Sequence, residues 1–277
     1  MGRARGCGPS PGESEAAGNA SRPYSEFAAI YDAVMRDVAY EMWADYIEEV
    51  CRRHGLRPET VLDVACGTGS STLPLARRGL RAAGVDISPE MLAIARAKAE
   101  ASGLEVEFVR QDMRRLRTDR LRTGPTFDLV TCLYDSINYL TDPRDIEEAF
   151  CRFHAALRPG GLLVFDVNSA KRLSQMSQTT LFMEGPGWAF IGQNSYDPAG
   201  RIWTITVTGF VRRRGELYRR FREVHRERAY SIEEIGRLLR RAGFHLLAAY
   251  KAFGFEPADE ETARIYFVAR RPADGSC

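Results

Sequence analysis

The most constraining feature of the chain is the segment VLDVACGTGS at residues 61–70. Its first half, residues 61–65, is an apolar run that predicts a short buried strand, and Gly67 and Gly69 predict a turn directly after it. In α/β sheets, ligands bind beyond the carboxyl ends of the strands, where the next helix offers free N–H groups. The segment therefore predicts an α/β fold with a nucleotide-like ligand at this turn.

The rest of the chain predicts a parallel sheet around this strand. Ser88-Pro89 and Asp142-Pro143 each combine an N-cap residue with a proline suited to the first helical position, so a helix is expected to begin at both points. Strands that alternate with helices predict a Rossmann-like, doubly wound sheet. The six further strands are expected at residues 80–86, 104–110, 127–132, 162–167, 244–250 and 264–269, which makes a seven-stranded sheet.

The remaining segments divide the chain into a tail and one domain, residues 23–270. Residues 1–22 are rich in Gly, Ser, Ala and Pro, and predict a disordered tail. Residues 201–211 alternate polar and apolar side chains, which indicates a half-buried antiparallel strand, and 216–230 is expected to pair with it. Within the domain we expect a helical lid at 23–55 with helices at 24–36 and 41–54, a cofactor-binding core at 56–168, a small antiparallel insert at 169–230 and the end of the core at 231–270.

Composition excludes several classes of protein. The 277 residues carry a formal net charge of only +2, so no general attraction to nucleic acid or to a membrane is expected. No run approaches the roughly 18 apolar residues of a membrane helix. The six cysteines form no C-x-x-C pair and no zinc-ligand spacing with the four histidines, so we expect no metal and free thiols in the cytoplasm. The sequence predicts no oligomeric state.

The spacing of the glycines narrows the choice of ligand. A dinucleotide site needs G-x-G-x-x-G, and residues 65–70 contain no such spacing. The other known pattern, an acidic residue before a small-x-Gly-x-Gly turn, is matched by Asp63 and residues 65–69. Asp86 ends the second strand, where its carboxylate can accept both hydroxyls of a ribose. An NAD(P)-dependent oxidoreductase and a non-catalytic cofactor-binding protein remain the alternatives.

Five segments in succession resemble the motifs of class I S-adenosylmethionine-dependent methyltransferases. They are DVACGTG at 63–69, GVDISPEML at 84–92, RQDMRRL at 110–116, FDLVTCLYDSINYL at 127–140 and LRPGGLLVFDVNS at 157–169. YSEFAAIYDAVM at 24–35 and EVHRERAY at 223–230 are similar to the lid and insert of the small-molecule type. The resemblance implies S-adenosylmethionine as cofactor and methyl transfer to N or O of a small molecule.

The resemblance also assigns cofactor contacts residue by residue. The turn at 65–69 would pack against the methionine part, Asp86 would bind the ribose, and Asp112 would accept the adenine amino group. Lid aromatic residues would lie near the sulfonium. The full set of implied cofactor-binding residues is Tyr24, Tyr31, Trp43, Asp63, Ala65, Gly67, Gly69, Asp86, Ile87, Asp112, Met113 and Leu133.

The acceptor is expected beyond the fourth and fifth strands. Methyl transfer is an in-line displacement that needs desolvation, alignment and in some cases removal of a proton. Asp135 and His225 are therefore candidate bases and Tyr31 is the third catalytic candidate, although His225 could equally be an exposed strand residue paired with glutamates. The candidate acceptor-binding residues are Tyr134, Asn138, Tyr139, Asn168 and Arg228.

The insert contains eight arginines between residues 212 and 228, against three glutamates. This local charge could bind a phosphate or an acidic substrate, which leaves an RNA or protein methyltransferase open as an alternative. No aromatic stacking platform is interleaved with the arginines, as single-stranded nucleic acid would require. We therefore expect a solvated hairpin, and nucleic acid is disfavoured as a partner.

Overall fold

The computed structural model describes residues 20–273. Most of the expected tail, residues 1–19, lies outside this range. Its last residues are placed against the insert, since the backbone N–H of Ser21 donates to the carbonyl of Arg222 at 2.8 Å. The ordered part of the chain thus begins before Tyr24.

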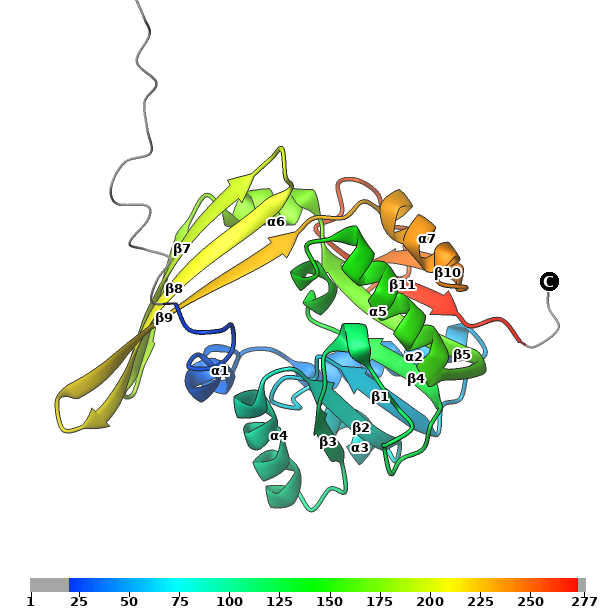
Figure 1. The fold of residues 1–277 in the computed structure, drawn as a ribbon, viewed down its shortest axis with the longest axis horizontal. Helices are drawn as coiled ribbons and strands as arrows, with labels where there is room; N and C mark the ends of the chain where they lie inside the picture. Colours follow the sequence, from blue (N-terminus) through cyan, green and yellow to red (C-terminus); the bar gives the residue numbers. More distant parts are fainter. Residues whose placement is uncertain (1–19, 274–277) are drawn as a thin grey trace, which may run out of the picture.

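The core is a seven-stranded sheet with the order β10-β11-β5-β4-β1-β2-β3, which confirms the predicted fold class (Figure 1). All neighbouring strands are parallel except β11, which runs antiparallel to both β5 and β10. Strand order reverses between β1 and β4, the place where such sheets bind ligands. The strands are β1 Thr60–Val64, β2 Arg81–Asp86, β3 Glu107–Arg110, β4 Phe127–Cys132, β5 Leu157–Asn168, β10 His245–Lys251 and β11 Arg264–Arg270.

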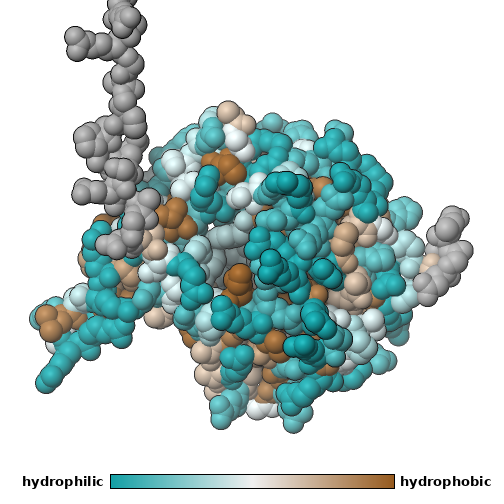
Figure 2. Space-filling view, in the orientation of Figure 1, coloured by the Kyte–Doolittle hydropathy of each residue, from teal (hydrophilic) through white to brown (hydrophobic). Residues whose placement is uncertain are grey.

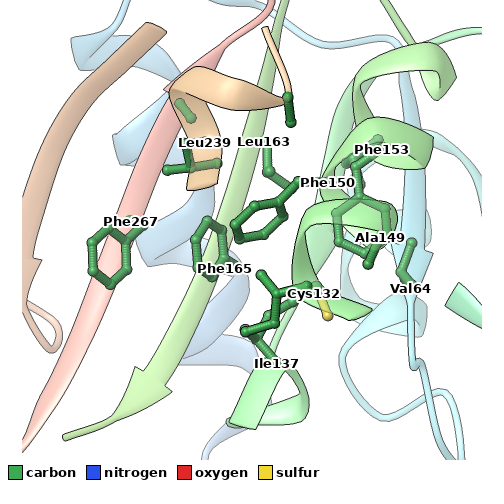
Figure 3. Close-up of a cluster of buried hydrophobic side chains, with 14 of the residues drawn as sticks. Val64, Cys132, Ile137, Ala149, Phe150, Phe153, Leu163, Phe165, Leu239 and Phe267 are labelled. Atoms are coloured by element: carbon green, nitrogen blue, oxygen red, sulfur yellow. The ribbon is translucent and has the colours of Figure 1, made fainter. Parts of the chain in front are cut away.

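Helices cover both faces of this sheet. The two predicted caps are confirmed, because the side chains of Ser88 and Asp142 each accept a backbone N–H at the start of a helix. Ser231 caps a third helix in the same way. On one face, the ring of Phe165 in β5 stacks on that of Phe267 in β11, with ring centroids 5.1 Å apart (Figure 3). The Phe165 and Phe150 ring centroids, the latter from α5, are 5.2 Å apart. The helices are α2 Tyr40–Arg53, α3 Thr72–Arg77, α4 Pro89–Ala101, α5 Pro143–Ala156 and α7 Ile232–Arg241, with 3-10 turns η1 Met113–Arg115 and η2 Ser136–Tyr139.

The insert is larger than the sequence indicated. It is a four-stranded antiparallel sheet in the order β6-β7-β8-β9, and its β8–β9 hairpin extends away from the core (Figure 1). The elements are α6 Ala170–Met176, β6 Thr180–Gly185, β7 Trp188–Asp197, β8 Ile202–Arg214 and β9 Leu217–Arg228. Only β8 and β9 were expected, so α6, β6 and β7 are additions.

The lid lies between the insert and the core. Helix α1, Ala28–Val34, packs Phe27 and Ile30 against Phe190 and Trp203 of the insert. The expected helix at 24–36 is too long at its N-terminus, because Tyr24 has a φ of +58°, which an α-helix does not allow. Tyr24 instead lies in a turn against the insert strand β9.

The structure can be compared with the expectations drawn from composition for residues 20–273. Within this range no helix is long and apolar enough to cross a membrane. Cys51, Cys66 and Cys132 are buried free thiols and Cys151 is an exposed one. No group of three metal-ligating side chains occurs in the described part of the chain.

Candidate active site

A cavity of about 540 Å³ opens at the carboxyl ends of β1, β2 and β4 and is closed by the lid. This volume lies within the usual range for small-molecule sites. Residues from the β1 turn, the ends of β2, β3 and β4 and the lid all line it. The structure therefore brings together segments that are more than 100 residues apart in the chain.

The turn after β1 has the unusual backbone that the sequence predicted. Ala65, Gly67 and Gly69 have φ values of +56°, +54° and +74°. At Gly69 a Cβ atom would also lie 3.0 Å from the Phe108 ring and 3.2 Å from Ala95, so a larger residue would be strained in its backbone and would crowd both neighbours. Ala65 and Gly67 line the cavity, and their backbone forms its floor on this side.

Asp63 lies beneath this turn and is absent from the cavity lining. Its buried carboxylate accepts hydrogen bonds from the hydroxyls of Ser71, Thr72 and Thr131 at 2.7, 2.6 and 2.7 Å. Burial raises the pKa of Asp63. These contacts join the start of α3 to β4 and hold the turn from below.

Asp86 faces the cavity from the end of β2. Its two carboxylate oxygens accept the backbone N–H groups of Gly67 at 2.9 Å and Ser88 at 2.8 Å, which fix its orientation. Burial raises the pKa of Asp86. Each oxygen keeps a free lone pair for a ligand hydroxyl. Ile87 follows at the rim and is 57% exposed, an unusual place for an isoleucine unless a ligand covers it.

Asp112 and Met113 line the cavity at the end of β3. Asp112 caps the short turn η1 by accepting the N–H of Arg114 at 2.9 Å. The Arg114 guanidinium, at 2.6 Å, lowers the pKa of Asp112 and also pairs with Asp145 of α5 at 2.9 Å. Sequence reasoning missed Arg114, which joins Asp112 to Asp145 of α5 in one ionic group.

Aromatic side chains form the opposite wall. Trp43 is 6% exposed and stacks on Tyr134 with ring centroids 5.0 Å apart, so it packs the lid onto the core and also lines the cavity. Tyr24 and Tyr31 meet edge to face at 5.8 Å. Leu133 lies in the floor, and Tyr40, which the sequence did not single out, completes the wall.

A chain of hydrogen bonds leads from this wall into the insert. The Tyr24 and Tyr139 hydroxyls are 2.6 Å apart, and the Tyr139 hydroxyl is 3.1 Å from Nδ1 of His225. The hydrogen-bonded chain ends at His225, because its Nε2 lies 3.2 Å from a carboxylate oxygen of Glu223 but forms no hydrogen bond with the described residues. His225 is only 3% exposed, so the alternative of an exposed strand residue is wrong. Burial raises the pKa values of both tyrosines, which keeps their hydroxyls protonated.

Four other candidates for the acceptor site are absent from the cavity lining: Asp135, Asn138, Asn168 and Arg228. The Asn138 amide donates to the carbonyls of Asn168 and Arg228, both at 2.9 Å, and thereby ties η2 to β5 and β9. Arg228 turns towards α7 and pairs with Glu234 at 2.9 Å. These residues therefore connect η2, β5, β9 and α7 and do not line the cavity.

Asp135 belongs to a buried ionic cluster with Asp166, Glu227 and Arg264. Arg264 pairs with Asp135 at 2.7 Å and also with Asp166. Burial raises the pKa of Asp166 to about 6. Burial and the nearby Asp135 raise the pKa of Glu227 well above its ordinary range. One guanidinium therefore serves three carboxyls, and burial favours the protonated form of Glu227.

Asp166 also controls the backbone that presents Tyr134. It accepts the N–H groups of Tyr134 at 2.7 Å and Asp135 at 3.1 Å. Both of these residues have positive φ values, +62° and +54°, which are uncommon outside glycine. Their turn directs the Tyr134 ring into the cavity.

Comparisons with known proteins agree with this geometry. Residues 61–161 match the family model described as a methyltransferase domain. A protein of Geobacillus sp. (strain WCH70) that is named a methyltransferase is 34% identical over 251 residues, which cover 90% of this chain and 99% of that protein. YqeM of Bacillus subtilis (strain 168), also named a methyltransferase, is 32% identical over 90% of this chain and 97% of its own.

A solved structure gives the same result for the whole fold. The S-adenosylmethionine-dependent methyltransferase from Clostridium acetobutylicum ATCC 824 superposes with a TM-score of 0.78 at 33% identity, over 90% of this chain and 98% of that one. The matched 90% of this chain includes most of both the core and the insert. The chain therefore belongs to the S-adenosylmethionine-dependent methyltransferases.

Proposed function

We propose that the protein transfers the methyl group of S-adenosylmethionine to a nitrogen or oxygen atom of a small-molecule acceptor bound in this cavity. The observation that carries the proposal is the composition of the lining. Asp86 and the β1 turn lie on one side and Tyr134 and Tyr139 on the other, and Tyr24 of the lid reaches from Ser88 to Tyr139. Such an enclosed site excludes water and aligns two small reactants.

The cofactor fits the residues on the first side. The Asp86 oxygens suit a ribose, exposed Ile87 suits an adenine face, and Asp112 can accept its amino group. The aromatic rings of Tyr24 and Tyr31 can attract the positive sulfonium by cation–π interaction. When bound, the cofactor supplies an electrophilic methyl group.

A hydroxyl or a primary or secondary amine loses a proton when it is methylated. The Tyr139 hydroxyl can take that proton while it passes its own to Nδ1 of His225, 3.1 Å away. Glu223, 3.2 Å from Nε2, then stabilises the charged imidazole. In this scheme His225 acts through Tyr139, Tyr31 contacts the cofactor, and Asp135 is a positioning residue because Arg264 already pairs with it.

The lining also favours a small acceptor over RNA or protein. The arginines of the β8–β9 hairpin do not occur in it, and the hairpin extends away from the core (Figure 1). In Figure 2 the hairpin is mostly hydrophilic, with a hydrophobic patch near its end, where Leu217 is 70% exposed. Arg219 pairs with Glu26 of the lid and Arg228 with Glu234 of α7. We assign the exposed Arg212, Arg213, Arg214, Arg220 and Arg226 to a solvated surface. We place the reaction in the cytoplasm.

Named relatives support both N- and O-methylation. A dTDP-3-amino-3,6-dideoxy-alpha-D-glucopyranose N,N-dimethyltransferase from Streptomyces fradiae is 33% identical over 52% of its length. A ubiquinone biosynthesis O-methyltransferase from Cronobacter sakazakii is 34% identical over 46% of its length. The chain spans only about half of each, so they support the kind of acceptor atom and leave the acceptor molecule open.

The test is incubation of the protein with a small-molecule extract and methyl-labelled S-adenosylmethionine, followed by mass spectrometry. We expect label in a small molecule, and thermal stabilisation of the protein by S-adenosylhomocysteine but not by NAD or NADP. Label found only in RNA or protein would contradict the proposed acceptor class. With the acceptor in hand, Tyr139→Phe should slow transfer at least tenfold and leave S-adenosylhomocysteine affinity unchanged.

A further inference from the structure

Glu223 is a buried acidic side chain whose contacts reach the N-terminal segment. It is 0% exposed and lies on β9 of the insert. One carboxylate oxygen accepts the N–H of Tyr24 at 2.8 Å, and the other accepts those of Glu26 at 2.6 Å and Phe27 at 2.9 Å. The Ser25 hydroxyl lies 3.3 Å from the same carboxylate, although its shorter hydrogen bond, at 2.7 Å, goes to the carbonyl of Arg22. A single side chain of the insert thus contacts four consecutive residues of the lid and accepts the backbone N–H groups of three of them.

These bonds replace a cap that the lid helix lacks. Helix α1 begins at Ala28, and its N-cap residue, Phe27, makes no side-chain capping bond. Backbone N–H groups that are shielded from water need acceptors. Glu223 supplies them to Tyr24, Glu26 and the N-cap residue Phe27 from a strand that follows almost 200 residues later.

The segment held in this way covers the cofactor side of the cavity. We call residues 21–27 the lid strap. Arg22, Tyr24 and Ser25 of the strap line the cavity beside Asp86. The Tyr24 carbonyl accepts the hydroxyl of Ser88 at 2.8 Å, and the N–H of Ser88 in turn holds the Asp86 carboxylate. Movement of the strap would therefore open the cavity at the position proposed for the ribose.

We propose that Glu223 is a positioning residue that fixes the lid strap over the bound cofactor, so that the insert sets how long S-adenosylmethionine and S-adenosylhomocysteine remain bound. The inference rests on the proposed cofactor site. It adds to that site a residue that touches neither reactant. Because the same carboxylate lies beside His225, one residue of the insert joins the cover of the cofactor to the hydrogen-bonded chain at the acceptor.

The first experiment measures the dissociation rate of labelled S-adenosylhomocysteine from wild type and from Glu223→Gln. The amide keeps the shape but has one accepting oxygen, and its NH₂ group faces N–H donors. We expect dissociation to become at least tenfold faster. If Glu223→Gln binds S-adenosylhomocysteine and releases it at the wild-type rate, the positioning role of Glu223 is overturned and the cofactor site is not. If the wild-type protein does not bind S-adenosylhomocysteine, both proposals are overturned.

Glu234→Gln is the matched control. Glu234 is also a buried carboxylate, 9% exposed, and it pairs with Arg228 at 2.9 Å and Arg201 at 3.1 Å without reaching the strap or the cavity. We expect it to lower the melting temperature and to leave the dissociation rate unchanged. A rate increase equal to that of Glu223→Gln would show a general effect of lost stability and would overturn the proposal.

Hydrogen exchange on the wild-type protein tests the same idea without any substitution. Since Glu223 holds the amides of Tyr24, Glu26 and Phe27, their exchange should report strap opening. We expect S-adenosylhomocysteine to slow their exchange at least tenfold. If these amides exchange equally fast with and without the ligand, the strap does not retain the cofactor and the proposal fails.

Discussion

The parallel core and the antiparallel insert contribute to the site in different ways. The core supplies the cofactor side through backbone: the β1 turn, with its positive φ values, and the two N–H groups that orient Asp86. The insert supplies no cavity-lining residue, yet its buried Glu223 and His225 hold the side chains and the strap that form the wall. One region binds directly, and the other positions what binds.

The largest effect expected from this contrast is at Asp86. Asp86→Asn removes the charge that would accept the ribose hydroxyls and disturbs the bonds to Gly67 and Ser88. Charge-assisted hydrogen bonds are worth about 1.5–3 kcal/mol each, so the Kd for S-adenosylhomocysteine should rise about 100-fold. Isothermal titration calorimetry gives this number directly.

The control for that measurement is Asp119→Asn. Asp119 is exposed, pairs only with Arg117 at 2.9 Å among the described contacts, and lies outside the cavity lining. Its substitution should leave the Kd unchanged. A Kd for Asp86→Asn within threefold of wild type would show that the core does not bind the cofactor through this carboxylate.

One glycine in the core and one in the insert allow the same substitution, glycine to alanine, to be compared in the two regions. At Gly84 of β2 a Cβ atom would lie 2.6 Å from the Phe108 ring and 2.8 Å from Sγ of Cys66. At Gly185 of β6 it would lie 2.7 Å from the Trp188 ring. Either substitution by alanine should reduce the free energy of unfolding by about 2 kcal/mol, because overpacking forces neighbours to shift.

Ligand binding should separate these two variants. Cys66 belongs to the cofactor turn, so Gly84→Ala should also weaken S-adenosylhomocysteine binding, whereas Gly185→Ala, at the far edge of the insert sheet, should not. Denaturant unfolding and calorimetry on the same samples measure both quantities. Equal loss of affinity in the two variants would refute the division of roles between core and insert.

The same division explains what could be predicted from the sequence. Gly67, Gly69 and Asp86 were identified because their roles depend on local backbone and on their place at strand ends. Glu223 was missed as a contact of the lid, because its partner Tyr24 lies 199 residues away. Asn138 follows the fourth strand as an acceptor contact would, but its amide turns to β5 and β9.

The insert strands show a second reason for the missed elements. Strand β8 alternates buried and partly exposed residues, and that period of two made it recognisable. Strand β6 is an edge strand with no fully buried residue, and its Leu181 and Phe182 are exposed apolar side chains. A strand that buries neither face shows no alternation of polar and apolar residues in its sequence. Strand β6 is therefore recognised only by its hydrogen-bonded pairing with β7.

The last prediction concerns pH and the buried ionic cluster of Asp135, Asp166, Glu227 and Arg264. Burial and Asp135 raise the pKa of Glu227 above its ordinary value of 4.5, so the folded protein keeps a proton that the unfolded chain releases. Stability from this group is therefore present below pH 4.5 and is lost as pH rises towards the folded-state pKa, by up to about 1.4 kcal/mol per pH unit.

Glu227→Gln should remove that loss, because the amide resembles the protonated carboxyl and can still accept the bond from Asn168, now at 3.2 Å. Near pH 4.5 the variant should be about as stable as wild type, and its relative stability should increase with pH up to neutrality. Denaturant unfolding at several pH values measures the difference. Parallel curves for the two proteins would mean that Glu227 is ionised in the fold, and that Arg264 alone compensates three negative charges. The insert would then meet the core through a strained ionic contact rather than through a shared proton.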